Sequence, residues 1–127
     1  MSRVQIQTDE APQAIGSYSQ GVRMGNLIFL TAQIGLTAGT GTLASGITAQ
    51  VEQVLKNLEA VARAAGATLA DVGKLTIYLT ELESFGAVNS ALERYFTAPF
   101  PARASVGVKE LALGAEVAMD ATLVLDQ

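Results

Sequence analysis

The amino-acid sequence predicts an α+β fold, in which a mixed β-sheet carries two helices on one of its faces. Apolar residues recur every three or four positions over residues 47–65, the spacing of an amphipathic helix. Over residues 74–80 and 115–125 they alternate with polar or small residues, which is typical of strands buried on one side. The length of 127 residues is close to that of one folded unit, so residues 1–127 are expected to form a single domain.

The elements are expected in the order β-β-α-β-α-β-β. Gly25 and Asn26 form a two-residue turn signal between two apolar runs, which predicts a β-hairpin. Gly66 is a natural end for the first helix, Ser84 is the expected N-cap of the second, and the run Pro99–Pro101 must be extended. The expected strands are 18–24, 27–32, 74–80, 103–109 and 115–125, and the first helix is 47–65.

The composition excludes several classes of chemistry. The chain has no Cys and no His, which excludes thiol nucleophiles, disulfides, zinc–thiolate sites and catalysis through a histidine base. Any reaction must therefore use Arg, Lys, carboxylates, hydroxyl and amide side chains, backbone groups and water.

Charge and hydropathy restrict the classes of molecule that this chain is expected to bind. A net charge of −4 without a basic run argues against binding to nucleic acid or to anionic lipid. Neither a signal peptide nor a membrane span is expected, which predicts a cytoplasmic protein. Half of the residues are hydrophobic and 16% are charged, which indicates either a dense core or a surface that faces another subunit. A sheet face without helices favours the second interpretation, a homo-oligomer.

Arg103 is the most informative charged residue. It follows a proline-fixed segment and shares a strand face with Ser105 and Gly107. A guanidinium held beside small residues suits a planar carboxylate, because it donates two parallel charge-assisted hydrogen bonds. The alternative is a solvated arginine at the start of a strand.

Four further residues are weaker candidates by themselves. Asn89 lies beside the apolar stripe of the second helix, and Tyr18 stands at the start of the first strand. Each also fits an ordinary structural role, in local hydrogen bonding or in packing. Asp120 and Glu116 are predicted to share a strand face, where two carboxylates suit acid–base work or simply a solvated edge.

Four short motifs occur in order along the chain. They are Ala-Ile-Gly-Ser-Tyr-Ser-Gln-Gly over 14–21, Leu-Thr-Ala-Gln-Ile over 30–34, Phe-Gly-Ala-Val-Asn over 85–89 and Phe-Pro-Ala-Arg-Ala-Ser-Val over 100–106. Together they resemble the motifs of the RidA/YjgF family of enamine/imine deaminases. The resemblance implies a chorismate-mutase-like fold and a homotrimer with active sites in clefts between subunits. It also implies hydrolysis of 2-aminoacrylate and related enamine or imine acids to 2-keto acids and ammonia, without a metal or an organic cofactor.

The resemblance also implies roles for five residues. Arg103 matches the arginine that clamps the substrate carboxylate, and Tyr18 and Asn89 match residues that line the cleft. Ala32 and Ser105 stand where backbone groups of relatives contact the ligand.

This chain departs from the family pattern in ways that matter for activity. Ala118 stands where active members place the glutamate proposed to orient the attacking water. Asp120 and Glu116 are candidate surrogate acids, about 6–7 Å along the strand from position 118. The expected activity is that of a 2-iminobutanoate/2-iminopropanoate deaminase-type hydrolase, which Ala118 would weaken. The alternative is a family member that binds a carboxylate or keto acid, or acts as an interaction protein, without turnover.

Overall fold

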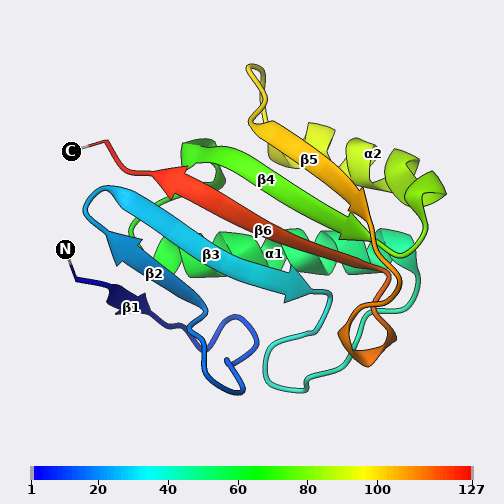
Figure 1. Cartoon of the computed structure of the whole chain (residues 1–127), viewed down its shortest axis with the longest axis horizontal. Helices are drawn as coiled ribbons and strands as arrows, with labels where there is room; N and C mark the ends of the chain where they lie inside the picture. Colours follow the sequence, from blue (N-terminus) through cyan, green and yellow to red (C-terminus); the bar gives the residue numbers. More distant parts are fainter. Residues whose placement is uncertain (1, 127) are drawn as a thin grey trace.

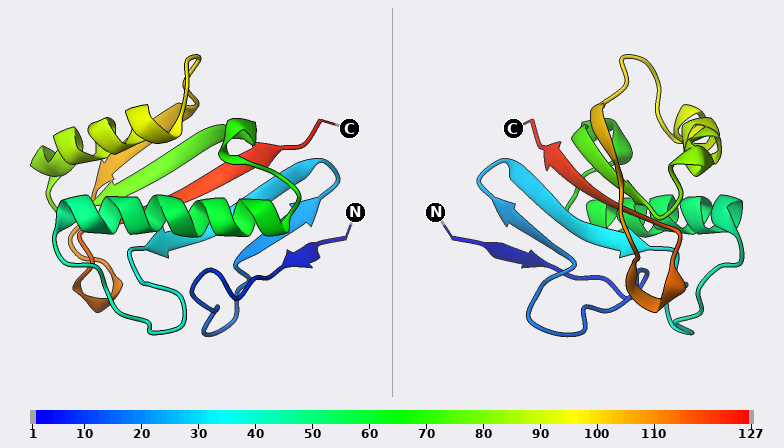
Figure 2. Two further views of the ribbon diagram at one scale, coloured as in Figure 1. Left: turned by 180° about the vertical axis from the view of Figure 1, so that it is seen from behind. Right: turned by 45° about the vertical axis from the view of Figure 1, so that its right-hand side comes forward.

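Within residues 2–126, the computed structural model contains one six-stranded sheet and two α-helices on one face of it (Figures 1 and 2). The strands lie in the order β1-β2-β3-β6-β4-β5, and only the β4–β5 pair is parallel. This arrangement confirms the predicted α+β class. The strands are β1 Val4–Ile6, β2 Gly21–Met24, β3 Leu27–Ile34, β4 Val72–Leu79, β5 Ala102–Gly107 and β6 Val117–Val124, and the helices are α1 Ile47–Ala64 and α2 Phe85–Tyr95.

Helix α1 lies across the sheet and supplies one side of the core (Figure 2). Its apolar stripe is buried, as the spacing predicts, and the polar face of the helix is turned toward solvent. Gly66 ends it with a left-handed backbone (φ 79°), while the amides of Gly66 and Ala67 donate to Arg63 and Ala62 carbonyls. The fully buried residues of the helix include Val51, Val54, Leu55, Leu58 and Val61, and those of the sheet include Ile28, Ile77, Met119 and Leu123.

Helix α2 packs beside α1 over the β4–β5 edge of the sheet. Its residues Val88 and Leu92 and its C-cap Phe96 are buried in the core. Ser84 is the N-cap residue of α2, as predicted, but its side chain makes no capping hydrogen bond. A 3-10 turn over Leu82–Ser84 runs directly into α2, so the chain already turns helically before the helix begins.

The first predicted strand differs most from the structure. It begins at Gly21 rather than residue 18, and β1 pairs with it although no strand was predicted there. Three residues are too few for a readable alternation. The segment before Gly21 is held as a loop by the buried carboxamide of Gln20, which accepts from the Thr8 amide (2.7 Å) and donates to the Pro12 carbonyl (2.7 Å).

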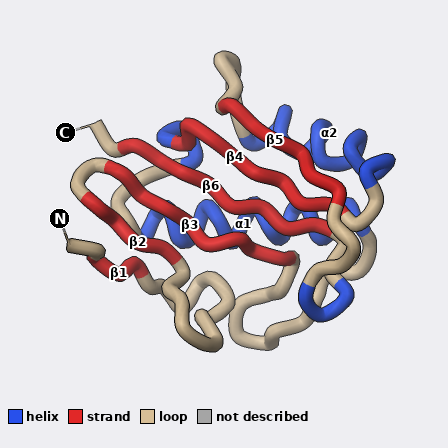
Figure 3. The backbone as a smooth tube through the Cα atoms, viewed as in Figure 1, coloured by secondary structure: helices blue, strands red, loops and turns tan. Residues whose placement is uncertain are grey.

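The face of the sheet opposite the helices has no cover within the described chain. Figure 3 shows the strands in front of both helices. Apolar residues that alternate with the core remain exposed on this face, which supports the predicted open face. They are Leu27, Phe29, Val106 and Val124. Between residues 2 and 126, no helix has the length and apolar character needed to cross a membrane.

Candidate functional site

The structure brings Arg103 and Asn89 together. Arg103 extends from the edge strand β5, and its Nη2 donates to Oδ1 of Asn89 on α2 at 2.8 Å. Its guanidinium carbon lies 4.8 Å from the centroid of the Phe85 ring, a cation–π contact. These contacts orient the guanidinium, and among residues 2–126 its other N–H groups have no hydrogen-bond partner, so the geometry is compatible with binding of a planar carboxylate.

A hollow of about 260 Å³ lies beside this pair and is here named the Arg103 hollow. Its wall is mainly apolar, and its polar groups come from α2 and β5. Such a site can hold a small molecule that has a carboxylate at one end and apolar carbon at the other. The lining residues are Leu75, Asn89, Leu92, Glu93, Phe96, Phe100, Pro101 and Arg103.

Tyr18 and Ala32 meet in a second hollow of about 250 Å³, here named the Tyr18 hollow. Tyr18 is half exposed, and its hydroxyl accepts a hydrogen bond from the Ile15 amide at 3.2 Å. Residues from the end of β3 and Leu113 of the β5–β6 connection complete the wall.

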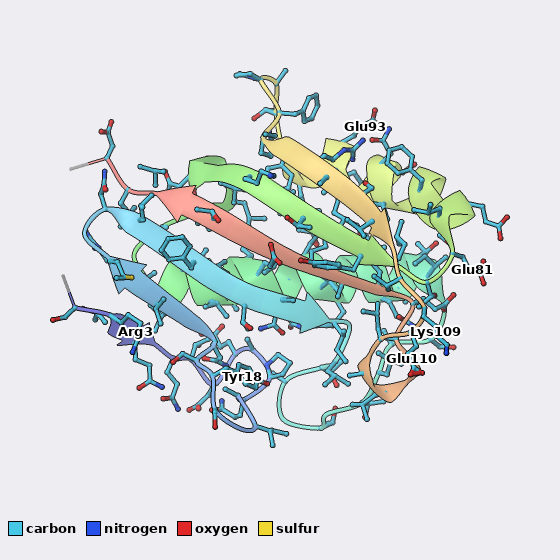
Figure 4. The ribbon with its side chains drawn as sticks, viewed as in Figure 1. Arg3, Tyr18, Glu81, Glu93, Lys109 and Glu110 are labelled. Atoms are coloured by element: carbon cyan, nitrogen blue, oxygen red, sulfur yellow. The ribbon has the colours of Figure 1, made fainter. Side chains whose placement is uncertain are left out.

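The two hollows do not meet within one chain. Figure 4 labels Tyr18 on the loop before β2 and Glu93 on α2, at opposite sides of the sheet. The strands β3 and β5 are three strand spacings apart in the sheet, about 14 Å. The sequence-predicted residues therefore form two half-sites, Arg103 with Asn89 and Tyr18 with Ala32.

Ser105 lies two residues beyond Arg103 on β5, opposite Ile77 of β4, and is half-buried. It does not line the Arg103 hollow. Gly107 packs tightly, since an added Cβ would lie 3.1 Å from Leu82 Cγ.

Ala118 is buried on β6, with Ile34 of β3 and Tyr78 of β4 as its cross-strand neighbours. Asp120 lies two residues farther along the same open face and accepts a hydrogen bond from the Tyr78 hydroxyl at 2.8 Å. This bond, together with desolvation and the nearby carboxylate charge, raises the pKa of Tyr78. The hydroxyl therefore stays protonated at neutral pH. The alternation of β4 placed Tyr78 on the polar face, but no sequence signal indicated its partner.

Glu116 lies outside the strand in which it was predicted, because β6 begins at Val117. Its backbone amide donates to Gln50 Oε1 at 2.8 Å, and its Oε2 accepts from Gln50 Nε2 at 3.4 Å. The prediction that Glu116 shares a strand face with Asp120 is therefore wrong. The buried Gln50 of α1 holds the chain at this junction and keeps Glu116 at the end of the sheet.

In the described part of the chain, no three carboxylates come close enough together to hold a metal ion. The two acids on or beside β6 are instead paired with neutral side chains, Asp120 with Tyr78 and Glu116 with Gln50.

Comparison with known proteins shows close relatives over the whole fold. The family model described as Endoribonuclease L-PSP matches residues 8–125. The 2-iminobutanoate/2-iminopropanoate deaminase of Escherichia coli (strain K12) is 38% identical over 122 residues, which cover 94% of this chain and 95% of that protein. The protein of the same name from Dermatophagoides farinae is 39% identical over 122 residues, 95% of each chain.

Solved structures agree with this chain in fold as well as in sequence. The crystal structure of RidA from an Antarctic Psychrobacter species superposes with a TM-score of 0.94 at 41% identity, covering 97% of this chain and 100% of that one. E. coli TdcF with bound serine superposes with a TM-score of 0.93 at 32% identity, covering 97% of this chain and 99% of that one.

Proposed function

Since this chain belongs to the RidA/YjgF family, we propose that it hydrolyses reactive enamine and imine acids of the 2-aminoacrylate type to 2-keto acids and ammonia. The observation that carries the proposal is the Arg103 guanidinium, oriented by Asn89 at 2.8 Å beside a small, mainly apolar hollow. An imine is already electrophilic, so its hydrolysis needs a carboxylate clamp and a placed water rather than a strong nucleophile. The absence of Cys and His is compatible with such chemistry.

An enamine acid first tautomerises to the imine, losing one N–H proton and gaining a proton at its terminal carbon. The imine then adds water and loses ammonia. Water attacks the imine carbon to form a C–O bond, and the resulting carbinolamine expels ammonia as its C–N bond breaks. Both protons of the water end on the nitrogen, so neither an oxidant nor a reductant is consumed. Arg103 holds the substrate carboxylate through these steps, and no cofactor takes part in the proposed reaction.

The complete active site is proposed to lie between subunits of a homotrimer. The Arg103 half-site and the Tyr18 half-site are about 14 Å apart in the sheet of one chain, and each is open. A neighbouring copy that contributes Tyr18 and the backbone at Ala32 would complete the Arg103 half-site, with Ser105 close by on β5. The exposed apolar residues of the open sheet face support such an assembly.

Asp120 is the proposed surrogate acid for the water. It lies on the same strand face as Ala118, and the Tyr78 hydroxyl holds one of its oxygens, which leaves the other able to accept from water. Glu116 is the weaker candidate, because it lies outside β6 and its carboxylate already accepts a hydrogen bond from Gln50.

A second candidate function follows from Ala118, which is buried between Ile34 and Tyr78 and has no polar side-chain group that could position a water. In that case the protein binds a carboxylate or keto acid through Arg103 and does not turn it over.

The direct test is ammonia release from 2-aminoacrylate generated in the assay, with wild type and Arg103→Ala compared. Hydrogen bonds to charged groups contribute about 1.5–3 kcal/mol each, so loss of a two-bond clamp should lower kcat/KM by at least about 100-fold. Arg63→Ala is the matched control, since Arg63 is exposed and makes only surface ion pairs. Equal rates for wild type, Arg103→Ala and buffer would reject the deaminase, and calorimetry with 2-ketobutyrate would then test binding without turnover.

A further inference from the structure

Glu93 gives the Arg103 hollow a negative charge for which the proposed carboxylate clamp has no use. Glu93 lines the hollow with Arg103 and Asn89. Asn89 and Glu93 are four residues apart on α2, so they lie on one face of the helix in successive turns. Because Asn89 is the hydrogen-bond partner of Arg103, the helix position that holds the cation and the one that carries the anion are about one helical turn apart.

The Glu93 carboxylate is not neutralised by its own chain. Among residues 2–126, the ion pairs of the structure join Arg63 to Glu10 and Glu59, and Arg94 to Glu52. Glu93 has neither an ion pair nor a side-chain hydrogen bond within that part of the chain. Its charge is therefore available to a ligand.

The remaining wall of the hollow is apolar. Leu75, Leu92 and Phe96 are buried at its base, while Phe100 is about half exposed at 55%. A volume of about 260 Å³ lies just below the range of about 300–1,000 Å³ typical of sites for drug-sized ligands. Size and lining therefore fit a small metabolite with an apolar side chain.

From this arrangement we infer that Glu93 binds the cationic nitrogen of a ligand whose carboxylate is held by Arg103. The ligand class is an α-amino acid or a protonated imino acid with an apolar side chain, which the hollow wall covers. For the imino acid, this inference rests on the proposed deaminase function. A carboxylate beside the nitrogen favours the protonated imine, which is the more electrophilic form, so Glu93 would act as a specificity-determining residue of the reaction.

The test compares two ligands of the same shape that differ in the cationic nitrogen. Leucine carries an ammonium group, and 4-methyl-2-oxopentanoate carries a ketone in its place. Calorimetry on the wild-type protein, Glu93→Gln and the control Glu83→Gln measures all Kd values. Glu83 also carries an exposed carboxylate, in the turn before α2, and it does not line the hollow.

We expect Glu93→Gln to weaken leucine binding about tenfold, since a hydrogen bond between charged groups contributes about 1.5 kcal/mol or more. The same substitution should leave keto-acid binding unchanged or stronger, because a charge that repels the ligand carboxylate is removed. Glu83→Gln should change neither Kd value.

A parallel loss of both ligands in Glu93→Gln, or of neither, would overturn the role of Glu93. Such a result leaves the deaminase proposal standing if Arg103→Ala still abolishes ammonia release. Failure of the wild-type protein to bind either ligand would overturn the inference as well. If the wild-type protein also released no ammonia, the proposed function would fail independently.

Discussion

Replacing Ala118 by Glu tests most directly how this chain handles the attacking water. Ala118 is 3% exposed and lies on the open sheet face between Ile34 and Tyr78. A glutamate there would extend from the sheet on the same side as Asp120, about 6–7 Å along the strand. A side chain positioned as a general acid or base typically accelerates a reaction about 10²–10⁴-fold. We therefore expect Ala118→Glu to raise kcat for ammonia release by about 100-fold or more.

The substitution also has an electrostatic cost. Two carboxylates about 7 Å apart repel by about 2 kcal/mol at an effective dielectric constant of about 20. This repulsion lowers the free energy of unfolding by a similar amount and raises the pKa of the added carboxyl. The gain in rate should consequently be largest at neutral to alkaline pH and fade as the pH falls.

The assay is ammonia release from 2-aminoacrylate, with Ala118→Gln as a control of nearly equal shape and no charge. Urea unfolding and 2-ketobutyrate binding would establish that each variant is folded and that the Arg103 clamp is intact. A variant Ala118→Glu that is folded, binds the keto acid and keeps the wild-type rate would refute the reasoning. An equal gain in Ala118→Gln would refute it too, since that gain could not come from a carboxylate.

Two further predictions concern stability. Asn57 is buried, and its Nδ2 donates to the carbonyls of Ile34 at 3.2 Å and Leu36 at 2.9 Å. Asn57→Ala should lower the free energy of unfolding, measured in urea, by about 2–4 kcal/mol, because both carbonyls lose their partner. A loss below about 0.5 kcal/mol would contradict this prediction. Because the pKa of Tyr78 is raised by its bond to Asp120, the folded protein keeps a proton that the unfolded chain loses near pH 10, and the free energy of unfolding should fall as the pH rises through that region. Tyr78→Phe should make this alkaline decline shallower in the same urea experiment, and an unchanged slope would show that the bond does not control the titration.

The best-predicted parts of the fold are those with a long periodic pattern. Helix α1 and the strands β4 and β6 were located within three residues at each end, since burial on one side imposes a regular spacing on the sequence. The short strand β1 was missed, and β2 was begun too early at Tyr18. No local pattern shows that the Gln20 carboxamide folds inward to bind the backbone of residues 8–12.

The candidate site residues also divide into those that the sequence identified and those that only the structure shows. Arg103 and Asn89 were identified from motifs, and the structure brings them into contact. Glu93 was not singled out, although it is four residues from Asn89, because only the hollow between α2 and β5 gives its charge a context. Glu116 was predicted to share a strand face with Asp120, but β6 begins only at Val117 and the Glu116 side chain bonds Gln50 of α1.

By itself, the sequence determined the class of the fold and the exclusion of thiol and imidazole chemistry, and it singled out Arg103 as the candidate for binding a carboxylate. These conclusions follow from the composition and from the spacing of residues that are near one another along the chain. Only the tertiary structure decided that Tyr78 bonds Asp120 across 42 residues and that Gln50 holds Glu116 across 66. It also decided that the two half-sites of one chain stay apart. Such contacts join segments that pack together only after the helices cover the sheet, so no local pattern encodes them.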